Sequence, residues 1–146
     1  MQQPTRKTFI LTPYFLALVS PAAVGSPRRA SADGGWTFTC EGKAVTTTGV
    51  LSGNCFRGDQ GQVCSRLDLN HCYGFGRDDK VHEQDDGNFM TSCHNCYYSF
   101  QFGGGIVECT CDGHDGLPLR VDLRTDNIVT NNGGYLECFG HVAEPC

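Results

Sequence analysis

The chain has 146 residues, of which 39% are hydrophobic and 18% charged, and its 16 acidic residues outnumber 11 basic ones. This length allows one domain with a modest core. The formal net charge of −5 repels phosphate backbones, which argues against nucleic-acid binding. No basic amphipathic helix is found, which argues against binding to or insertion into a membrane.

The N-terminus has the pattern of a secretory signal peptide. Arg6 and Lys7 precede a largely apolar run at residues 9–24, which ends in small residues. A charged start, a short apolar segment and a small-residue end are typical of such peptides, and the run is too short and interrupted for a transmembrane helix. We predict a signal peptide at residues 1–25 and a secreted, extracellular protein. The alternative is a buried N-terminal strand or helix.

Residues 26–35 are predicted to be a short linker or pro-segment. The dibasic pair Arg28-Arg29 is a candidate processing site, so the mature chain begins near Ser26 or Ala30. Removal of the first 29 residues leaves 7 basic and 16 acidic residues, a net charge of −9. All ten cysteines remain within these 117 residues. An even number at this density is typical of a secreted disulfide scaffold.

The first half of the mature chain has the periodicity of strands. In "WTFTC" (36–40) apolar and polar residues alternate, which predicts a strand. A hairpin that pairs Cys40 with Cys55 centres its turn at Thr47-Thr48, and we predict a disulfide between these two cysteines. A short helical turn is expected after "LDLN" (67–70).

The second half contains four cysteines, Cys93, Cys96, Cys109 and Cys111, at C-x-x-C…C-x-C spacing. Such a set can hold a zinc ion or form two disulfides. In an antiparallel hairpin, the residue numbers of two facing residues always add up to the same sum. The sums for the pairs Cys93–Cys111 and Cys96–Cys109 differ by one, and a β-bulge between Cys93 and Cys96 accommodates this shift of one residue. Facing strand residues also satisfy the Cα separation of a disulfide. We therefore favour two disulfides over zinc, with His94 as an exposed loop residue.

The strands of this hairpin alternate in the same way on both sides of a glycine-rich tip. Tyr98, Phe100 and Phe102 lead to the glycines at 103–105, which predict the hairpin tip. A second short helical turn is expected after "VDLR" (121–124).

The mature chain nearly repeats itself once. An aromatic residue stands four positions before a cysteine in "WTFTC" (36–40) and "FMTSC" (89–93), 53 residues apart, and "LDL" (67–69) matches "VDL" (121–123). Two copies indicate one pseudo-symmetric all-β domain rather than a solenoid. We assign repeat one to 36–87, repeat two to 88–141 and a tail to 142–146. The four remaining cysteines are Cys64, Cys72, Cys138 and Cys146, and their spacing leaves all three possible pairings open.

The doubled pattern, together with "LDLNHC", "GNF" and "GGYLEC", resembles the cyanovirin-N homology (CVNH) family, in particular its secreted fungal members. The resemblance implies two intertwined pseudo-domains, each a three-stranded sheet completed by a hairpin exchanged from the other repeat, with short 3-10 or α turns. It also implies a bridge between Cys72 and Cys138, which leaves Cys64 with Cys146.

The resemblance further implies a lectin that binds mannose-rich glycans at one groove per pseudo-domain, without a metal, a cofactor or catalysis. The groove in the second half would use Asn88, Thr91, Ser92, Asp112, Gly113, His114 and Asp78. Asp78 belongs to "GFGRDD" (74–79), a segment that lacks the asparagine of the family pattern, so that only Arg77 and Asp78 can substitute for it. The other groove would use Thr39, Arg57, Asn131 and Asn132. Phe56 and Gly133 stand there where the family pattern has polar residues.

These departures leave other functions open. The main alternative is a disulfide-rich secreted protein that keeps the scaffold, has lost sugar affinity and binds another protein at a cell or host surface. An enzyme is disfavoured because the five histidines stand in no recognisable catalytic motif. The protein is expected to be a monomer or a domain-swapped dimer, with the linker at 82–88 as the hinge.

Overall fold

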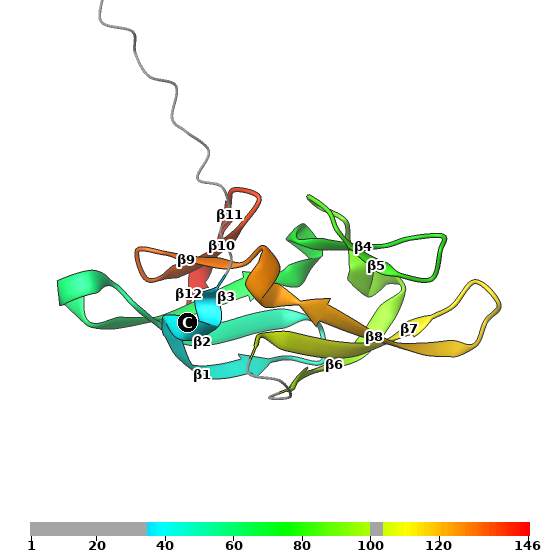
Figure 1. Cartoon of the computed structure of the whole chain (residues 1–146), viewed down its shortest axis with the longest axis horizontal. Coiled ribbons are helices and arrows are strands. Elements are labelled where there is room, and N and C mark those ends of the chain that lie inside the picture. The colour runs from blue at the N-terminus through cyan, green and yellow to red at the C-terminus, as the bar shows by residue number, and fades with distance from the viewer. Residues whose placement is uncertain (1–34, 100–103) are drawn as a thin grey trace, which may run out of the picture.

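A computed structural model describes residues 35–99 and 104–146 (Figure 1). The predicted signal peptide, nearly all of the 26–35 segment, and Phe100, Phe102 and Gly103 at the predicted hairpin tip lie outside this part. Within it, no helix is long and apolar enough to cross a membrane. The strands are β1 Cys40–Val45, β2 Val50–Phe56, β3 Gln62–Asp68, β4 Tyr73–Phe75, β5 Val81–Glu83, β6 Cys93–Ser99, β7 Ile106–Asp112, β8 Pro118–Arg124, β9 Thr130–Asn132, β10 Tyr135–Cys138, β11 His141–Val142 and β12 Glu144–Pro145.

The described chain also contains short 3-10 helices between the strands. They are η1 Trp36–Phe38, η2 Gly58–Gln60, η3 Leu69–His71, η4 Phe89–Thr91 and η6 Thr125–Asn127. The helices η3 and η6 confirm the turns predicted after "LDLN" and "VDLR".

The strands form two sheets, each covered by a smaller hairpin sheet (Figure 1). The orders are β1-β2-β3-β12, β6-β7-β8, β11-β10-β9 and β4-β5. The hairpin of each repeat lies on the sheet of the other. Tyr73 of β4 donates its hydroxyl to the Arg124 carbonyl (3.2 Å), and the Leu136 amide of β10 donates to Ser65 Oγ of β3 (2.8 Å). The all-β fold with exchanged hairpins is therefore confirmed.

The 3-10 helix that opens each repeat is held by the 3-10 helix that follows the sheet of the other repeat. The Asp126 carboxylate accepts hydrogen bonds from the Thr37 amide (3.1 Å) and hydroxyl (2.5 Å). At the equivalent place the Asn70 side chain accepts from the Met90 amide (3.0 Å). These contacts place residues 36–38 in η1, so the strand predicted for "WTFTC" from Trp36 onward was wrong. Phe38, expected on an apolar face, is 83% exposed.

Both long hairpins carry a bulge at equivalent positions. Cys93 faces Cys111, and the register shifts between His94 and Tyr97, which confirms the predicted bulge. Asn95 adopts a left-handed conformation there (φ 53°). In the first hairpin the shift lies between Glu41 and Ala44, where Gly42 has φ 59°. This second bulge was not predicted, whereas the turn predicted at 47–48 is confirmed.

All ten cysteines form disulfides, and the five pairs match those of the sequence analysis: Cys40–Cys55, Cys93–Cys111, Cys96–Cys109, Cys72–Cys138 and Cys64–Cys146. Three lie within hairpins, and the last two join the repeats. The predicted tail at 142–146 is part of the fold, because β12 pairs with β3 and Cys146 is bonded to Cys64. The cysteine cluster of the second hairpin is thus two disulfides rather than a zinc site.

One core runs through both repeats. Trp36 of η1 and Phe89 of η4 occupy equivalent positions, and both are fully buried. The Trp36 indole donates to the buried Thr125 hydroxyl (3.0 Å), which in turn donates to the Gly105 carbonyl (2.6 Å). The core therefore ties the start of repeat one to the end of the sheet in repeat two.

Candidate functional site

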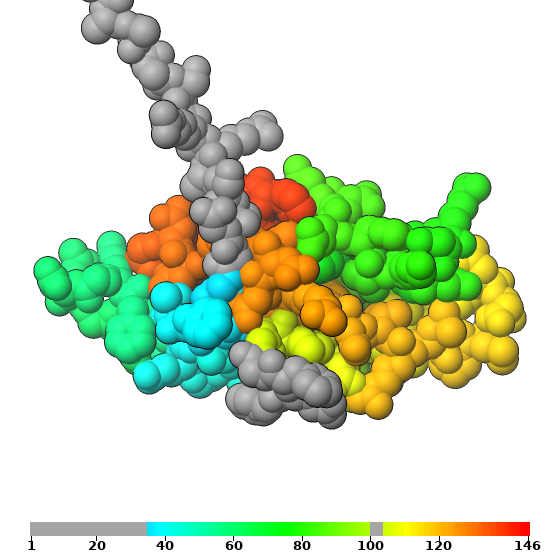
Figure 2. Space-filling model, in the orientation of Figure 1, coloured from blue at the N-terminus to red at the C-terminus, as the bar shows by residue number. Residues whose placement is uncertain are grey.

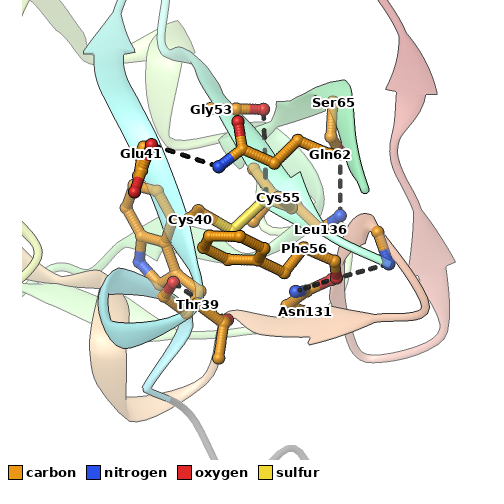
Figure 3. The surroundings of a disulfide bond; sticks show 12 residues. Thr39, Cys40, Glu41, Gly53, Cys55, Phe56, Gln62, Ser65, Asn131 and Leu136 are labelled. Atoms are coloured by element: carbon orange, nitrogen blue, oxygen red, sulfur yellow. Dashed lines mark hydrogen bonds between the residues drawn. A yellow bond between two sulfur atoms is a disulfide. The ribbon is translucent and has the colours of Figure 1, made fainter. Parts of the chain in front are cut away.

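The first candidate site lies where η1 and β2 end and β9 begins; we call Thr39, Phe56, Arg57 and Asn131 the first cluster. The Phe56 amide donates to the Thr39 carbonyl (2.9 Å), and the Asn131 side-chain amide donates to the Phe56 carbonyl (2.9 Å; Figure 3). Asn131 Oδ1 in turn accepts from the Gly134 amide (2.8 Å). Asn131 therefore fastens the β9–β10 turn of repeat two onto the end of β2.

The outer surface of the first cluster is aromatic and cationic. Phe56 is 46% exposed, and the Arg57 guanidinium lies 5.9 Å from the centre of the Tyr135 ring. Asn132, which was expected here, lies on the other face of β9, because successive strand residues point in opposite directions. Its amide donates to Glu137 (2.6 Å). The structure thus brings together Thr39, Arg57 and Asn131 but leaves Asn132 out.

The second candidate site repeats this construction at the end of β7; we call Ser92, Asp112, Gly113, His114 and Asp79 the second cluster. The Asp112 amide donates to the Ser92 carbonyl (2.7 Å), as Phe56 does to Thr39. The Asp112 side chain is exposed. A carboxylate therefore stands at the position that Phe56 occupies in the first cluster.

A loop of repeat one closes the second cluster. His114 donates its backbone amide to Asp79 Oδ1 (2.9 Å), and its Nδ1 lies 2.8 Å from the same oxygen. Hydrogen bonds from the His114 side chain and backbone hold the pKa of Asp79 below its ordinary value. Asp79 reaches this place because it adopts a left-handed conformation (φ 59°) in the β4–β5 turn.

Asp78, the residue that the sequence analysis placed at this site, is held elsewhere. Its carboxylate lies 2.8 Å from Nε2 of His82 on β5. Arg77, the other candidate in this turn, is exposed. The contribution of repeat one to the second cluster is therefore Asp79, next to the expected position.

Asn88 and Thr91 support the approach to η4. The Asn88 side-chain amide donates to the Asp86 carbonyl (2.8 Å), and the Thr91 hydroxyl donates to the Asn88 carbonyl (2.9 Å). Both side chains are exposed, so each retains acceptor capacity toward solvent. They flank the second cluster, which begins at Ser92.

The two clusters lie at opposite ends of the molecule. Figure 2 shows the segment after β2 (teal) at one end and the β7–β8 turn (yellow) at the other. The second cluster offers an exposed carboxylate and an exposed imidazole, which are groups that bind neutral hydroxyls. Gly113, also expected to bind sugar, is buried, and its amide and carbonyl are bonded within the β7–β8 turn. The first cluster offers an aromatic face and a guanidinium.

Four of the five histidines are paired with aspartates, which the sequence pattern did not predict. Besides the pairs at Asp79 and Asp78, His71 Nδ1 lies 2.5 Å from Asp86 and His141 Nε2 lies 2.8 Å from Asp85. No sequence spacing marks the last two pairs, because their partners are 15 and 56 residues apart. The adjacent "DD" at 85–86 is the only local signal.

Two pseudo-symmetric sheets, each completed by the other's hairpin and each carrying an equivalent surface cluster, define a two-repeat lectin fold. A family model of the CVNH domain matches residues 36–137. The chain belongs to the CVNH family. A search of curated proteins finds no match.

Solved structures share this fold at low sequence identity. The CVNH protein of Gibberella zeae is 18% identical, with a TM-score of 0.60 over 70% of this chain and 95% of that one. Microvirin, solved with mannobiose, is 24% identical, with a TM-score of 0.59 over 72% and 98%. A MoCVNH3 variant, solved with (N-GlcNAc)4, is 18% identical, with a TM-score of 0.57 over 72% and 97%.

Proposed function

We propose that this protein is a secreted, non-catalytic lectin that binds mannose-containing glycans through its second cluster. The observation that carries the proposal is the exposed Asp112 carboxylate, which the backbone bond to Ser92 holds beside the turn that His114 and Asp79 close. Vicinal sugar hydroxyls donate well to a carboxylate, and hydrogen bonds to charged groups are the stronger ones.

Pre-organisation of the second cluster supports this assignment. Its loop is closed by two contacts to one oxygen of Asp79, and the Gly113 amide donates to the Leu117 carbonyl (2.9 Å) within the β7–β8 turn. Fewer groups then have to be ordered when a sugar binds, which improves affinity. A single shallow site of this kind remains weak, so a dense glycan surface is the expected target.

Two related structures carry different sugars, mannobiose with microvirin and (N-GlcNAc)4 with the MoCVNH3 variant. We propose mannose for this chain because the second cluster presents an exposed carboxylate to the sugar hydroxyls, whereas the exposed phenylalanines Phe38 and Phe56 lie at the first cluster. Binding is proposed to be independent of metal ions, because Asp112 and His114 can form hydrogen bonds with the sugar hydroxyls directly.

Secretion is part of the proposal. Five disulfides that use all ten cysteines require an oxidising compartment, because cytosolic thiols are kept reduced. The charged and apolar pattern of residues 1–25 supports the same route. N-terminal sequencing of the protein from the culture medium of a secreting host tests this, with a start near Ser26 or Ala30 as the expected result.

The decisive experiment for sugar binding is a glycan array that contains both mannose and N-acetylglucosamine oligomers, probed with oxidised protein. We expect selective binding to mannose-terminated glycans, loss of that binding in Asp112→Ala, and no loss in Asp122→Ala, an exposed carboxylate on the neighbouring strand β8. Binding that is abolished in Arg57→Ala instead would assign the first cluster. Absence of binding by folded protein contradicts the proposal.

A second function is favoured by a specific observation, the exposure of two phenylalanines, Phe56 of the first cluster and Phe38 next to its Thr39. Phe38 is 83% and Phe56 46% exposed, and the backbone bond between Thr39 and Phe56 keeps their segments adjacent. Exposed aromatic residues beside an arginine are typical of protein-contact surfaces. Failure of the glycan array would therefore direct the search to a protein partner that Phe56→Ser no longer binds.

A further inference from the structure

A cluster of two histidines and two aspartates lies apart from both sugar-site clusters. His71 ends η3, Asp85 and Asp86 follow β5 in the linker between the repeats, and His141 begins β11. Asp86 Oδ1 lies 2.5 Å from His71 Nδ1 and 3.5 Å from His141 Nε2, while Asp85 Oδ1 lies 2.8 Å from His141 Nε2. Two imidazoles therefore converge on one carboxylate oxygen.

The backbone around this cluster is held by covalent and hydrogen bonds. The disulfide between Cys72 and Cys138 lies directly beside it, because Cys72 follows His71 and Cys138 faces His141 in the β10–β11 pair. The Asp86 amide donates to the His71 carbonyl (3.2 Å). The four side chains thus come from three segments whose relative position does not depend on the cluster itself.

Two further features are unusual for a simple surface ion pair. The rings of His71 and His141 are stacked, with centroids 4.3 Å apart and planes inclined by 15°. Asp86 adopts a left-handed conformation (φ 49°), which is uncommon for a residue other than glycine. The fold therefore holds two imidazoles face to face at one carboxylate.

We propose that His71, His141 and Asp86 bind a divalent transition-metal ion, with Zn²⁺ as the expected occupant and Asp85 or water as the fourth ligand. Two imidazoles with carboxylate oxygen suit Zn²⁺, whose four-coordinate sites combine nitrogen and oxygen ligands. The three ligand atoms lie within 4.8 Å of one another. Around tetrahedral zinc, neighbouring ligand atoms are roughly 3.4 Å apart, so a modest tilt of the half-exposed rings completes the geometry.

The ion would act on the junction between the repeats. It would tie the end of η3, the inter-repeat linker and β11 together at one point, beside the disulfide that already joins the repeats. This role is separate from sugar binding, because none of its ligands belongs to the second cluster. A chelator is therefore expected to remove the ion without changing glycan affinity.

The test is calorimetric titration of tag-free, oxidised protein with ZnCl₂ after treatment with a chelator. We expect saturable binding of one ion per chain, and a loss of affinity of more than about tenfold in His71→Gln and in His141→Gln. The matched control is His82→Gln, because His82 also pairs with one aspartate, Asp78 at 2.8 Å, but among the described residues belongs to no group of three possible metal ligands. This variant should bind Zn²⁺ as the unchanged protein does.

A second readout locates the ion. In NMR spectra, Zn²⁺ should shift the imidazole signals of His71 and His141 and leave those of His82 unchanged. Absence of saturable binding overturns the proposal, and so does binding that survives both His71→Gln and His141→Gln. A folded but non-binding His82→Gln variant would also overturn it, because the site would then lie elsewhere.

Discussion

The hydrogen bond between Trp36 and Thr125 is the contact whose removal is most informative about the fold. Both side chains are fully buried, and the indole N–H donates to the Thr125 hydroxyl over 3.0 Å. Substitution of Thr125 by valine keeps the shape of the side chain but removes the acceptor. The Gly105 carbonyl that the hydroxyl also contacts remains satisfied by the Thr125 amide (2.7 Å), so one buried donor is left unpaired.

The packing leaves no room for water to replace this acceptor. A Cβ atom built on Gly105 would lie 2.5 Å from Thr125 Oγ1 and 2.9 Å from Trp36 Nε1, so these groups are in close contact. An unpaired buried donor costs about 1–3 kcal/mol. We therefore expect Thr125→Val to lower the free energy of unfolding by about 1–3 kcal/mol. The control Thr125→Ser keeps the hydroxyl and loses one methyl group, for which about 0.8 kcal/mol is expected.

The assay is guanidinium unfolding with the disulfides intact, followed by the fluorescence of Trp36, the only tryptophan in the chain. A double-mutant cycle with Trp36→Phe, followed by circular dichroism, isolates the pair. In the Thr125→Val background, Trp36→Phe should cost less than it does alone, because the unpaired N–H is then gone. If Thr125→Val is no more destabilising than Thr125→Ser, the reasoning is refuted.

Two further predictions concern the oligomer and the pH dependence. In a domain-swapped dimer whose hinge is the inter-repeat linker, the two disulfides that join the repeats, Cys64–Cys146 and Cys72–Cys138, must form between the two chains. Such a dimer should therefore run as a covalent dimer in non-reducing gel electrophoresis. A dimer that dissociates under these conditions would exclude this hinge. The pKa of Glu108 is held below its ordinary value by a hydrogen bond from Tyr97 and by Ser99 and Arg120. A carboxylate whose pKa is lowered in the folded state stabilises the fold at pH values above its unfolded-state pKa, and this stabilisation is lost as the pH falls through the folded-state pKa. Glu108→Gln should therefore lower the melting temperature at neutral pH, and the difference in melting temperature between the variant and the unchanged protein should shrink in acid. A difference that does not change with pH would contradict the assignment.

The hairpins and their disulfides were predictable because residues that face each other in a hairpin are close in sequence and their numbers must add up to a constant sum. In the second hairpin, the cysteine numbers required a one-residue shift, and the structure has that shift at Asn95. The first hairpin has only one cysteine pair, so its equivalent bulge at Gly42 left no trace in the spacing. The prediction failed at Trp36 because the alternation of apolar residues is a local signal, whereas the Asp126 carboxylate that holds Thr37 in η1 is 89 residues away from Thr37.

The candidate site was predicted less completely than the fold because it depends on turn conformation. Sequence reasoning brought the β4–β5 turn to the second cluster but assigned Asp78 rather than Asp79. The two neighbouring carboxylates point to different histidines, His82 and His114, because Asp79 has a positive φ. Likewise, nothing in the pattern could bring His71 and His141 together, since 70 residues and the exchange of hairpins separate them.

The first cluster departs from the family pattern at Phe56 and Gly133. Both departures are tolerated because the contacts of the fold at these two positions are made by backbone groups rather than by their side chains. Asn131 holds the Phe56 carbonyl, so the contact between the repeats does not constrain which side chain stands at position 56. Gly133 and Gly134 both have positive φ (58° and 96°) between paired Asn132 and Tyr135, a two-residue turn in which glycine is favoured at both positions. The scaffold at this end is therefore maintained without a polar side chain at positions 56 and 133, whereas at the other end the Asp112 carboxylate is exposed. This asymmetry is why we assign glycan binding to the second cluster.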